Sequence, residues 1–372
     1  MNKPELSIIL PCYNESRNLP LIVERMKQFW PQYRFELVLV NNGSTDDTAA
    51  VLERLKNKYP DFLFPVTIEL NLGYGHGIHT GLKASRADVV AYTHADIQTP
   101  PEDVFRAYQM YKKHPAPGAD KNILVKGLRL NRREEEQFLT RWFSKIVRLV
   151  LGYPLDDING QPKLFSRVLL SELRNPPRDF SYDLYVMYMA RLRQFALVVF
   201  SVDFGERAHG KSHWATSVSR KYQTILKYLA NIFKMGWEHR SDGRNLFGQV
   251  LRFLATGVVT NVVNYGLFWT LLRLLNVDYR VSSACGFFAG FVAGFFINRA
   301  WTFKAAGGRS AAQWIKFSIL NAVSFGANLT TIWIFTAGLH WRPEFSQIMA
   351  IGGSMVINFV GSKLWVFRRY SA

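Results

Sequence analysis

Apolar and polar positions in the first half of the chain alternate between two patterns. Short runs rich in β-branched residues are typical of buried strands, and between them apolar residues recur at helical spacing. This alternation predicts an α/β domain with a mostly parallel sheet and helices on both faces. The predicted strands are 6–10, 36–40, 65–69, 88–92 and 122–126, and the predicted helices lie near 16–30, 45–58, 76–86 and 102–113.

The last third of the chain is much more apolar. It holds four long apolar segments, and each can cross a hydrocarbon core, which takes roughly 20 helical residues. They predict an all-α domain with four transmembrane helices. The predicted spans lie at about 251–272, 281–298, 315–338 and 346–366.

Basic residues distinguish the two sides of these spans. They gather between the second and third spans and at the chain end, whereas the other two connections hold few. Since cytoplasmic loops carry an excess of lysine and arginine, this bias predicts that both termini are cytoplasmic. The two basic groups are Arg299, Lys304, Arg309 and Lys316, and Lys363, Arg368 and Arg369.

The apolar segments also repeat one another. Aromatic, amide and basic residues recur at one constant offset, and so many matches make chance the weaker interpretation. The pattern predicts two helical hairpins related as repeats. The matched residues are Phe253 and Phe317, Asn264 and Asn328, Trp301 and Trp365, Phe303 and Phe367, Arg252 and Lys316, and Lys304 and Arg368.

Residues 214–237 form an amphipathic pattern between the two parts. One interpretation is a surface helix packed on its own domain. Because the segment precedes the apolar spans, we favour a helix that lies at the membrane surface. The predicted organisation is an α/β domain at 1–213, interfacial amphipathic helices at 214–245 and a transmembrane domain at 246–372.

Charge and composition narrow the class of partner. The 372 residues carry a formal net charge of +18, which indicates nucleic acid, anionic lipid or a phosphorylated substrate. No zinc-finger spacing or nucleic-acid motif occurs, so membrane and phosphate are favoured and no nucleic acid is expected. Cys12 and Cys285 are the only cysteines, so a reducing compartment fits. The amino terminus lacks a signal-peptide pattern, so no cleaved signal is expected.

Three polar residues follow the predicted strand 88–92. His94, Asp96 and Gln98 stand at alternate positions, which in an extended chain project to the same side. Ligands of parallel α/β sheets bind beyond the carboxyl ends of the strands. The stretch therefore predicts metal or phosphate contacts at this edge.

Two further strand ends carry polar residues. Tyr13 and Glu15 follow the first strand, where a ring could stack on a base and a carboxylate could accept from ribose. Asn41 and Asn42 leave the second strand. Taken alone, each stretch is equally an ordinary turn followed by a capped helix.

Cations and apolar residues are interleaved in 138–153. Arg141, Lys145 and Arg148 alternate there with Trp142 and other large apolar side chains. Such a surface suits a lipid chain that ends in phosphate. The alternative is a solvated amphipathic helix whose cations extend into water.

Several motifs in order give the chain a family resemblance. Residues 4–213 resemble the family 2 glycosyltransferases of the GT-A fold, in the branch of dolichol-phosphate mannose synthases and bacterial polyprenyl-phosphate glycosyltransferases. Residues 246–372 resemble the GtrA-type membrane domain, with "NRAWTF" and "SKLWVF" closing its two hairpins. The motifs of the first part are "PCYNE", "VNNGSTDDT", "NLGYGHGIHTGLKAS", "THADIQTPP", "KGLR", "DINGQPKLFSR" and "RAHGKSHW".

The resemblance implies an activity. The expected reaction is the inverting transfer of one sugar from a UDP- or GDP-sugar to a polyprenyl phosphate, undecaprenyl or dolichyl, with Mg²⁺ or Mn²⁺. The product would serve cell-envelope glycosylation. The expected location is the inner (cytoplasmic) membrane with the catalytic domain in the cytoplasm, and homo-oligomerisation is left open.

The resemblance also assigns residues. It implies metal binding by His94, Asp96 and Gln98, and nucleotide binding by Pro11, Tyr13, Glu15, Asn41, Asn42 and Gly73. It implies acceptor-phosphate binding by Arg129, Arg141, Ser144 and Lys163, and catalytic roles for Asp96, Asp157, Arg129 and Arg207.

The sequence departs from the family pattern at two places. His94 stands where the family has an aspartate, so it either ligates the metal, contacts the diphosphate or is a partly buried histidine bonded to backbone. Asn41 and Asn42 stand where the family usually has two aspartates, which leaves the base preference open. An alternative is therefore a pseudoenzyme attached to a flippase or scaffold. A processive polysaccharide synthase is disfavoured. Such enzymes carry a Gln-x-x-Arg-Trp signature, and "QFLTRW" has one residue too many between Gln137 and Arg141.

Overall fold

The computed structural model describes residues 3–115, 122–131, 134–205, 218–241, 245–305 and 310–367. It divides into two compact units, Met1–Met235 and Gly236–Ala372. The boundary falls inside the segment that the sequence predicts as interfacial linker.

The first unit is built on a seven-stranded sheet in the order β3-β2-β1-β4-β6-β5-β7. Every neighbouring pair is parallel except those of β6, which runs antiparallel to both β4 and β5. The predicted mostly parallel sheet is confirmed, with β6 and β7 added. The strands are β1 (Leu6–Cys12), β2 (Phe35–Asn42), β3 (Leu63–Ile68), β4 (Val89–Tyr92), β5 (Ile123–Arg129), β6 (Lys163–Ser166) and β7 (Ala196–Val202).

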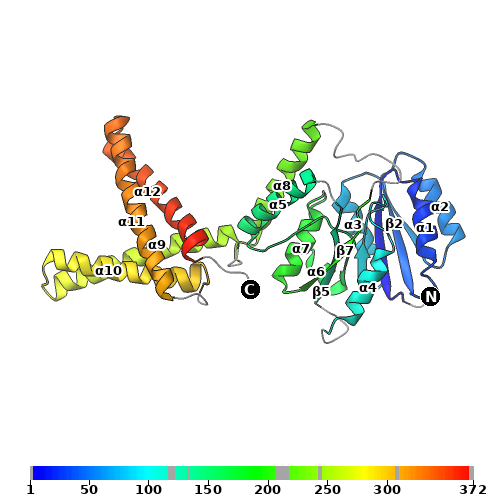
Figure 1. Cartoon of the computed structure of the whole chain (residues 1–372), viewed down its shortest axis with the longest axis horizontal. Coiled ribbons are helices and arrows are strands. Elements are labelled where there is room, and N and C mark those ends of the chain that lie inside the picture. The colour runs from blue at the N-terminus through cyan, green and yellow to red at the C-terminus, as the bar shows by residue number, and fades with distance from the viewer. Residues whose placement is uncertain are drawn as a thin grey trace. The chain divides into compact units, whose positions relative to one another are not determined.

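Helices cover both faces of this sheet (Figure 1). Alternate residues of β1 point to opposite faces. Ile8 belongs to the core cluster that includes α1, α2 and α4, whereas Ile9 packs against Gly81 of α3 on the other face. The helices are α1 (Asn18–Lys27), α2 (Thr48–Lys58), α3 (Tyr74–Ala84), α4 (Asp103–Lys113), α5 (Glu134–Leu151), α6 (Arg167–Glu172), α7 (Tyr182–Leu192) and α8 (Val218–Glu238).

Strand register fixes which residues meet at the carboxyl edge. β1 lies between β2 and β4 in parallel, so the three strands end at the same edge. The antiparallel β6 starts at that edge, and Lys163 stands opposite both Tyr92 of β4 and Lys126 of β5. Loops from both halves of the sheet therefore converge there.

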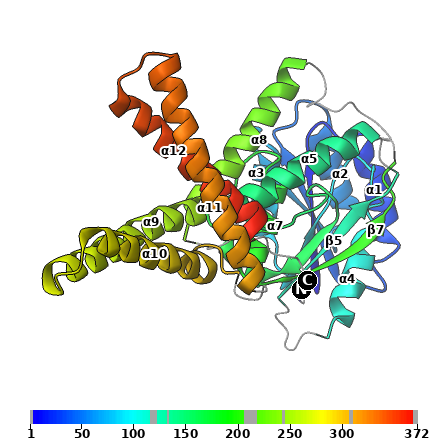
Figure 2. The same ribbon diagram turned by 60° about the vertical axis from the view of Figure 1, so that its left-hand side comes forward.

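Among the described residues, the second unit holds four helices that are long and apolar enough to cross a membrane, which confirms the four predicted apolar helices. Within this unit α9 packs against α10 and α11 against α12 (Figure 2). Each helix ends in a π-helical turn. The helices are α9 (Leu246–Trp269) with η2 (Thr270–Leu274), α10 (Tyr279–Ile297) with η3 (Asn298–Thr302), α11 (Ser310–Trp333) with η4 (Ile334–Gly338), and α12 (Pro343–Gly361) with η5 (Ser362–Val366).

Matched aromatics of the two hairpins pack together. Phe303 and Phe367 occupy equivalent places in the repeat, and their rings stack with centroids 5.3 Å apart. Phe295 and Phe317 belong to the same buried cluster, together with Ala305, Leu320 and Val366. Phenylalanines from both hairpins therefore contribute to the core of the second unit.

Close helix packing gives a first prediction. A methyl group at Gly286 of α10 would lie 2.6 Å from the carbonyl oxygen of Asn264 in α9, so we expect Gly286→Val to lower the free energy of unfolding by about 1–3 kcal/mol. The matched control is Gly352→Val in α12, because no described atom lies within 4 Å of a methyl group there. Thermal unfolding in detergent checks both, and equal melting temperatures would contradict the close contact.

Candidate active site

The loops after β1 and β2 are joined where the two strands end. The backbone N–H of Asn14 donates to Ser44 Oγ at 3.1 Å, and the N–H of Glu15 donates to Thr48 Oγ1 at 3.0 Å. Pro11 at the end of β1 faces the start of α3, where a methyl group at Gly77 would lie 3.3 Å from its Cβ. This edge thus brings the first and second candidate motifs together.

The two asparagines of β2 brace these loops. Asn41 Oδ1 accepts the N–H of Ser44 at 3.1 Å. Asn42 Nδ2 donates to the carbonyl of Gly73 at 3.1 Å, and its Oδ1 is buried with no hydrogen-bond partner among the described residues. Asn42 therefore has a spare acceptor, and nucleotide binding by both asparagines stays a prediction.

Tyr13, Glu15 and Gly73 lie around the same edge. Tyr13 and Glu15 are half-buried, and Glu15 Oε2 accepts from Asn18 Nδ2 at 2.5 Å. Gly73 has φ 120°, and a methyl group there would lie 2.4 Å from the carbonyl oxygen of Arg178. Only glycine fits this position without strain, so its place in the motif has a structural cause.

The expected alternation of His94, Asp96 and Gln98 on one side of a strand is wrong in detail. β4 ends at Tyr92, and Ile97 adopts φ 58° in the left-handed region. The cause is a turn in which Asp96 Oδ1 accepts the N–H of Gln98 at 3.2 Å. A β-branched residue in this region is strained, and such strain clusters at functional sites.

Residues 204–205, called the strap below, hold the end of the turn at residues 93–98. The N–H of Gly205 donates to the carbonyl of Gln98 at 2.8 Å, and Gln98 Nε2 donates back to the carbonyl of Gly205 at 3.2 Å. Phe204 lies beneath the guanidinium of Arg129, with 5.1 Å between the carbon Cζ and the ring centroid. The strap therefore touches both the 93–98 turn and the end of β5.

The donor atoms of the turn fit a divalent cation that also takes substrate oxygens. Asp96 is 6% exposed and contributes one carboxylate, beside the Gln98 amide. Among the described residues no group of three or more His, Cys, Asp or Glu side chains could hold a metal by itself. Mg²⁺ commonly uses one or two carboxylates together with phosphate oxygens and water, so this sparse set suits that cation.

His94 lies in an aromatic stack. Its ring lies on Tyr74 with centroids 5.4 Å apart, and Tyr74 in turn stacks on Phe180 at 5.2 Å. Burial lowers the pKa of His94, although the neighbouring Asp96 opposes that shift. A neutral imidazole is the form that can ligate a metal.

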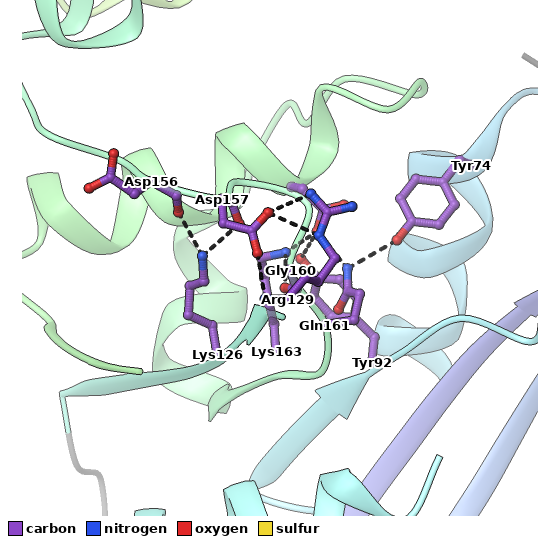
Figure 3. Close-up of polar contacts among 10 residues, drawn as sticks. Tyr74, Tyr92, Lys126, Arg129, Asp156, Asp157, Gly160, Gln161 and Lys163 are labelled. Atoms are coloured by element: carbon purple, nitrogen blue, oxygen red, sulfur yellow. Dashed lines mark hydrogen bonds and ion pairs between the residues drawn. The ribbon is translucent and has the colours of Figure 1, made fainter. Parts of the chain in front are cut away.

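Arg129 and Asp157 form the second part of the site (Figure 3). Arg129 ends β5 and donates its backbone N–H to Asp157 Oδ2 at 2.8 Å and its Nε to Oδ1 at 2.9 Å, with Nη2 also on Oδ1. Burial would raise the pKa of Asp157, but the hydrogen bonds and charge of Arg129 outweigh it, and the pKa is lowered. An ionised carboxylate thus fixes the guanidinium.

Two buried lysines support the Asp157 loop. Lys126 Nζ donates to the carbonyls of Asp156 at 2.7 Å and Asp157 at 2.6 Å. Burial, with a smaller effect from the charge of Lys163, lowers the pKa of Lys126 to about 7. Lys163 Nζ donates to the carbonyl of Gly160 at 3.1 Å. Both ammonium groups bond the loop from inside the protein.

Lys163, which the sequence analysis assigns to the acceptor phosphate, is buried inside the first unit. Its side chain has 0% exposure, and its ammonium is 2.5 Å from Asp183 Oδ1. Sequence reasoning missed Asp183. The signal was a single carboxylate at the start of an otherwise apolar segment, "YDLYVMYMA", which resembles an ordinary helix start.

The remaining acceptor candidates lie on α5 or outside the described residues. Arg141 is exposed, and the Ser144 hydroxyl is buried with no hydrogen-bond partner among the described residues. Phe143 packs edge-on against Tyr228 of α8, with centroids 5.3 Å apart. Arg207 falls in 206–217, outside the described residues.

Comparison with known proteins identifies both units. Residues 7–174 match the model of glycosyl transferase family 2. The first unit is a family 2 glycosyltransferase. Residues 252–367 match the GtrA/DPMS transmembrane domain. The recognised pairing of a family 2 glycosyltransferase with a GtrA-like membrane domain is confirmed, and the protein is an enzyme of the polyprenyl-phosphate glycosyltransferase type.

Two relatives of this family 2 glycosyltransferase are named for their activities. It is 25% identical to a dolichol-phosphate mannosyltransferase of Pyrococcus furiosus, over 95% of this chain and 98% of the relative. It is 29% identical to an undecaprenyl-phosphate 4-deoxy-4-formamido-L-arabinose transferase of Pseudomonas syringae over 56% of this chain, and spans 60% of that relative's length.

Solved structures give distant matches to the family 2 glycosyltransferase. A mannosyltransferase of Pyrobaculum calidifontis, in complex with GDP-Man and Mn²⁺, is 19% identical with a TM-score of 0.44, over 98% of this chain and 88% of that chain. A glucosyl-3-phosphoglycerate synthase of Mycobacterium tuberculosis is 21% identical with a TM-score of 0.46, over 61% and 79%.

Proposed function

We propose that this glycosyltransferase transfers a single sugar from a UDP- or GDP-sugar to a polyprenyl phosphate, undecaprenyl or dolichyl phosphate, with Mg²⁺ or Mn²⁺ and inversion at the anomeric carbon. The observation that carries the proposal is the convergence, at one sheet edge, of the Asp96 turn and the Arg129–Asp157 pair. The relatives named for dolichol-phosphate and undecaprenyl-phosphate transfer support the acceptor class.

On the donor side, Asp96 and Gln98 would hold the cation, with His94 beside them. When bound, that cation supplies positive charge to the diphosphate that leaves the anomeric carbon. The nucleotide would be bound by the residues at the ends of β1 and β2 and before α3, which are Pro11, Tyr13, Glu15, Asn41, Asn42 and Gly73. The spare Oδ1 of Asn42 can accept a hydrogen bond from a base or ribose.

On the acceptor side, Arg129 would hold the phosphate of the lipid. Asp157 fixes Nε and Nη2 of Arg129, so the guanidinium keeps one orientation. Its Nη1 has no hydrogen-bond partner among the described residues and would bind a phosphate oxygen. A phosphate monoester is already ionised near neutral pH, so its attack needs no strong general base. Asp157 then acts by positioning Arg129. The residues proposed to bind the acceptor phosphate are Arg129, Arg141, Ser144 and Arg207. Lys163 is proposed instead to support the site from the protein interior.

The apolar second unit, together with the amphipathic helix α8, is proposed to bring the lipid acceptor to the catalytic unit. We propose domain boundaries at 1–213, 214–245 and 246–372, with α8 and its neighbouring linker at the membrane surface. Exposed Leu226, Phe233 and Trp237 lie on α8 beside lysines, as an interfacial helix requires. Both termini and the catalytic unit would face the cytoplasm at the inner membrane.

Transfer by purified protein tests the proposal. We expect full-length enzyme in detergent to move radiolabelled sugar from one member of a UDP- and GDP-sugar panel into a polyprenyl-phosphate product, only with Mg²⁺ or Mn²⁺ present. Nuclear magnetic resonance of the product reports the anomer. Failure with every donor would favour a flippase or scaffold, and long polymer would indicate a processive synthase.

A further inference from the structure

A carboxylate at the start of α7 lies behind both halves of the site. Asp183 is 2% exposed, and residues 182–190 of α7 are all buried. Its Oδ1 accepts three hydrogen bonds, from Tyr92 Oη at 2.8 Å, Gln161 Nε2 at 2.9 Å and Lys163 Nζ at 2.5 Å. A buried charge with so many donors fixes every group that it holds.

One arm of this network reaches the acceptor side. Lys163 Nζ bonds Asp183 and also the carbonyl of Gly160. Gly160 in turn donates its N–H to the carbonyl of Asp157 at 2.8 Å, and Asp157 holds Arg129. Asp183 is thus joined to the Arg129 guanidinium through one short loop. Figure 3 shows Lys163, Gly160, Asp157 and Arg129 of this connection.

The other arm reaches the donor side. Gln161 Nε2 bonds Asp183 and also lies 3.2 Å from the hydroxyl of Tyr74. Tyr74 stacks on His94 of the 93–98 turn, which also holds Asp96. Tyr92, the last residue of β4, donates directly to Asp183. The same carboxylate oxygen therefore holds groups on both sides of the site.

We propose that Asp183 is a positioning residue that aligns the acceptor arginine with the donor turn. The proposal rests on the transfer function above, because it concerns the distance between two substrates. It assigns no substrate contact to Asp183. If the residue sets alignment, its loss slows transfer while each substrate still binds its own half, since a misplacement near 1 Å can slow a reaction about 100-fold.

Asp183→Asn tests this role in the full-length enzyme. We expect kcat to fall by about 10- to 100-fold while the KM of nucleotide sugar and of polyprenyl phosphate each stay within about threefold. Unchanged kcat in an active wild-type background would overturn the inference. Absence of transfer in the wild type would instead overturn the proposed function, so the two failures are distinguishable.

Glu36→Gln is the matched control. Glu36 is 2% exposed and near the amino end of β2, at the opposite edge of the sheet. It accepts from Ser7 Oγ at 2.6 Å and from the N–H and Nε of Arg86 at 2.5 and 2.7 Å. We expect it to lower the melting temperature with kcat unchanged. An equal loss of kcat in both variants at matched melting temperatures would assign Asp183 to stability alone.

Gln161→Met keeps the test decisive if Asp183→Asn does not fold. This change removes the Tyr74 arm and leaves the Asp183–Lys163 ion pair intact. We expect kcat to fall by several-fold with both KM values retained. A kcat equal to that of the wild type would show that the arm aligns nothing and would overturn the proposal.

Discussion

Asp96→Ala should strongly reduce transfer, with kcat about 100- to 1,000-fold below the wild type. Asp96 offers the one buried carboxylate of the 93–98 turn, and the proposed cation has no comparable ligand among His94 and Gln98. Removal of the charge leaves the departing diphosphate without its main electrostatic stabilisation, which typically reduces kcat by a factor of about 100 to 1,000 for a single group. Radiolabelled transfer measures the loss.

Thermal shift separates loss of the cation site from loss of the fold. A nucleotide and Mn²⁺ that bind only the native state raise the melting temperature. We expect this rise in the wild type and its absence in Asp96→Ala. Asp88→Asn is the control, because Asp88 lies on the surface with a side-chain exposure of 67% and, among the described residues, forms its ion pair with Lys3 alone. A full Mn²⁺-dependent shift in Asp96→Ala would contradict the assignment.

Periodicity predicted the elements with long, regular patterns. β1 to β5, α1 to α4 and the four apolar helices lie close to their predicted ranges. The missed strands are β6, which has only four residues and begins with a lysine, and β7, whose apolar run 196–202 carried the signal. Short strands are held by neighbours distant in sequence, so local pattern predicts them poorly.

The site was predictable only in part, because its polar partners are far apart in the chain. His94, Asp96 and Gln98 were found, but the left-handed Ile97 that bends them into a turn was not. Lys163 was predicted at the acceptor, because a lysine gives no sequence signal that Asp183, 20 residues later, will bury it. Pairing of this kind depends on the register of β6 against β4 and β5, which composition does not specify.

Arg129→Ala should both stop transfer and destabilise the first unit. Arg129 is the main partner of Asp157, whose side chain is 5% exposed, and breaking such a buried pair costs roughly 3–5 kcal/mol. In the wild type the lowered pKa of Asp157 gives stability that is present above its unfolded pKa near 3.9 and is lost as pH falls through the folded value.

The variant weakens this pH dependence. Arg129→Ala removes the guanidinium but keeps the backbone N–H that donates to Asp157 Oδ2, so the pKa of Asp157 is lowered less and the variant gains less stability as pH rises above the carboxyl range. We expect the difference in unfolding free energy between wild type and variant to be largest near neutral pH and to shrink below about pH 4. Denaturant unfolding from pH 3 to 8 measures it. A constant difference across that range would contradict the coupling of the two residues.

A double variant separates acceptor binding from stability. Arg129→Ala with Asp157→Ala removes both charges, so no buried carboxylate is left behind and much of the lost stability should return. Transfer should stay at least about 100-fold reduced, because no guanidinium remains to orient the lipid phosphate. Arg129→Lys keeps the charge but loses the fork that Asp157 holds, so we expect an intermediate rate and a raised KM for polyprenyl phosphate. If the double variant recovered transfer, the guanidinium would be a structural partner of Asp157 and the acceptor phosphate would bind elsewhere.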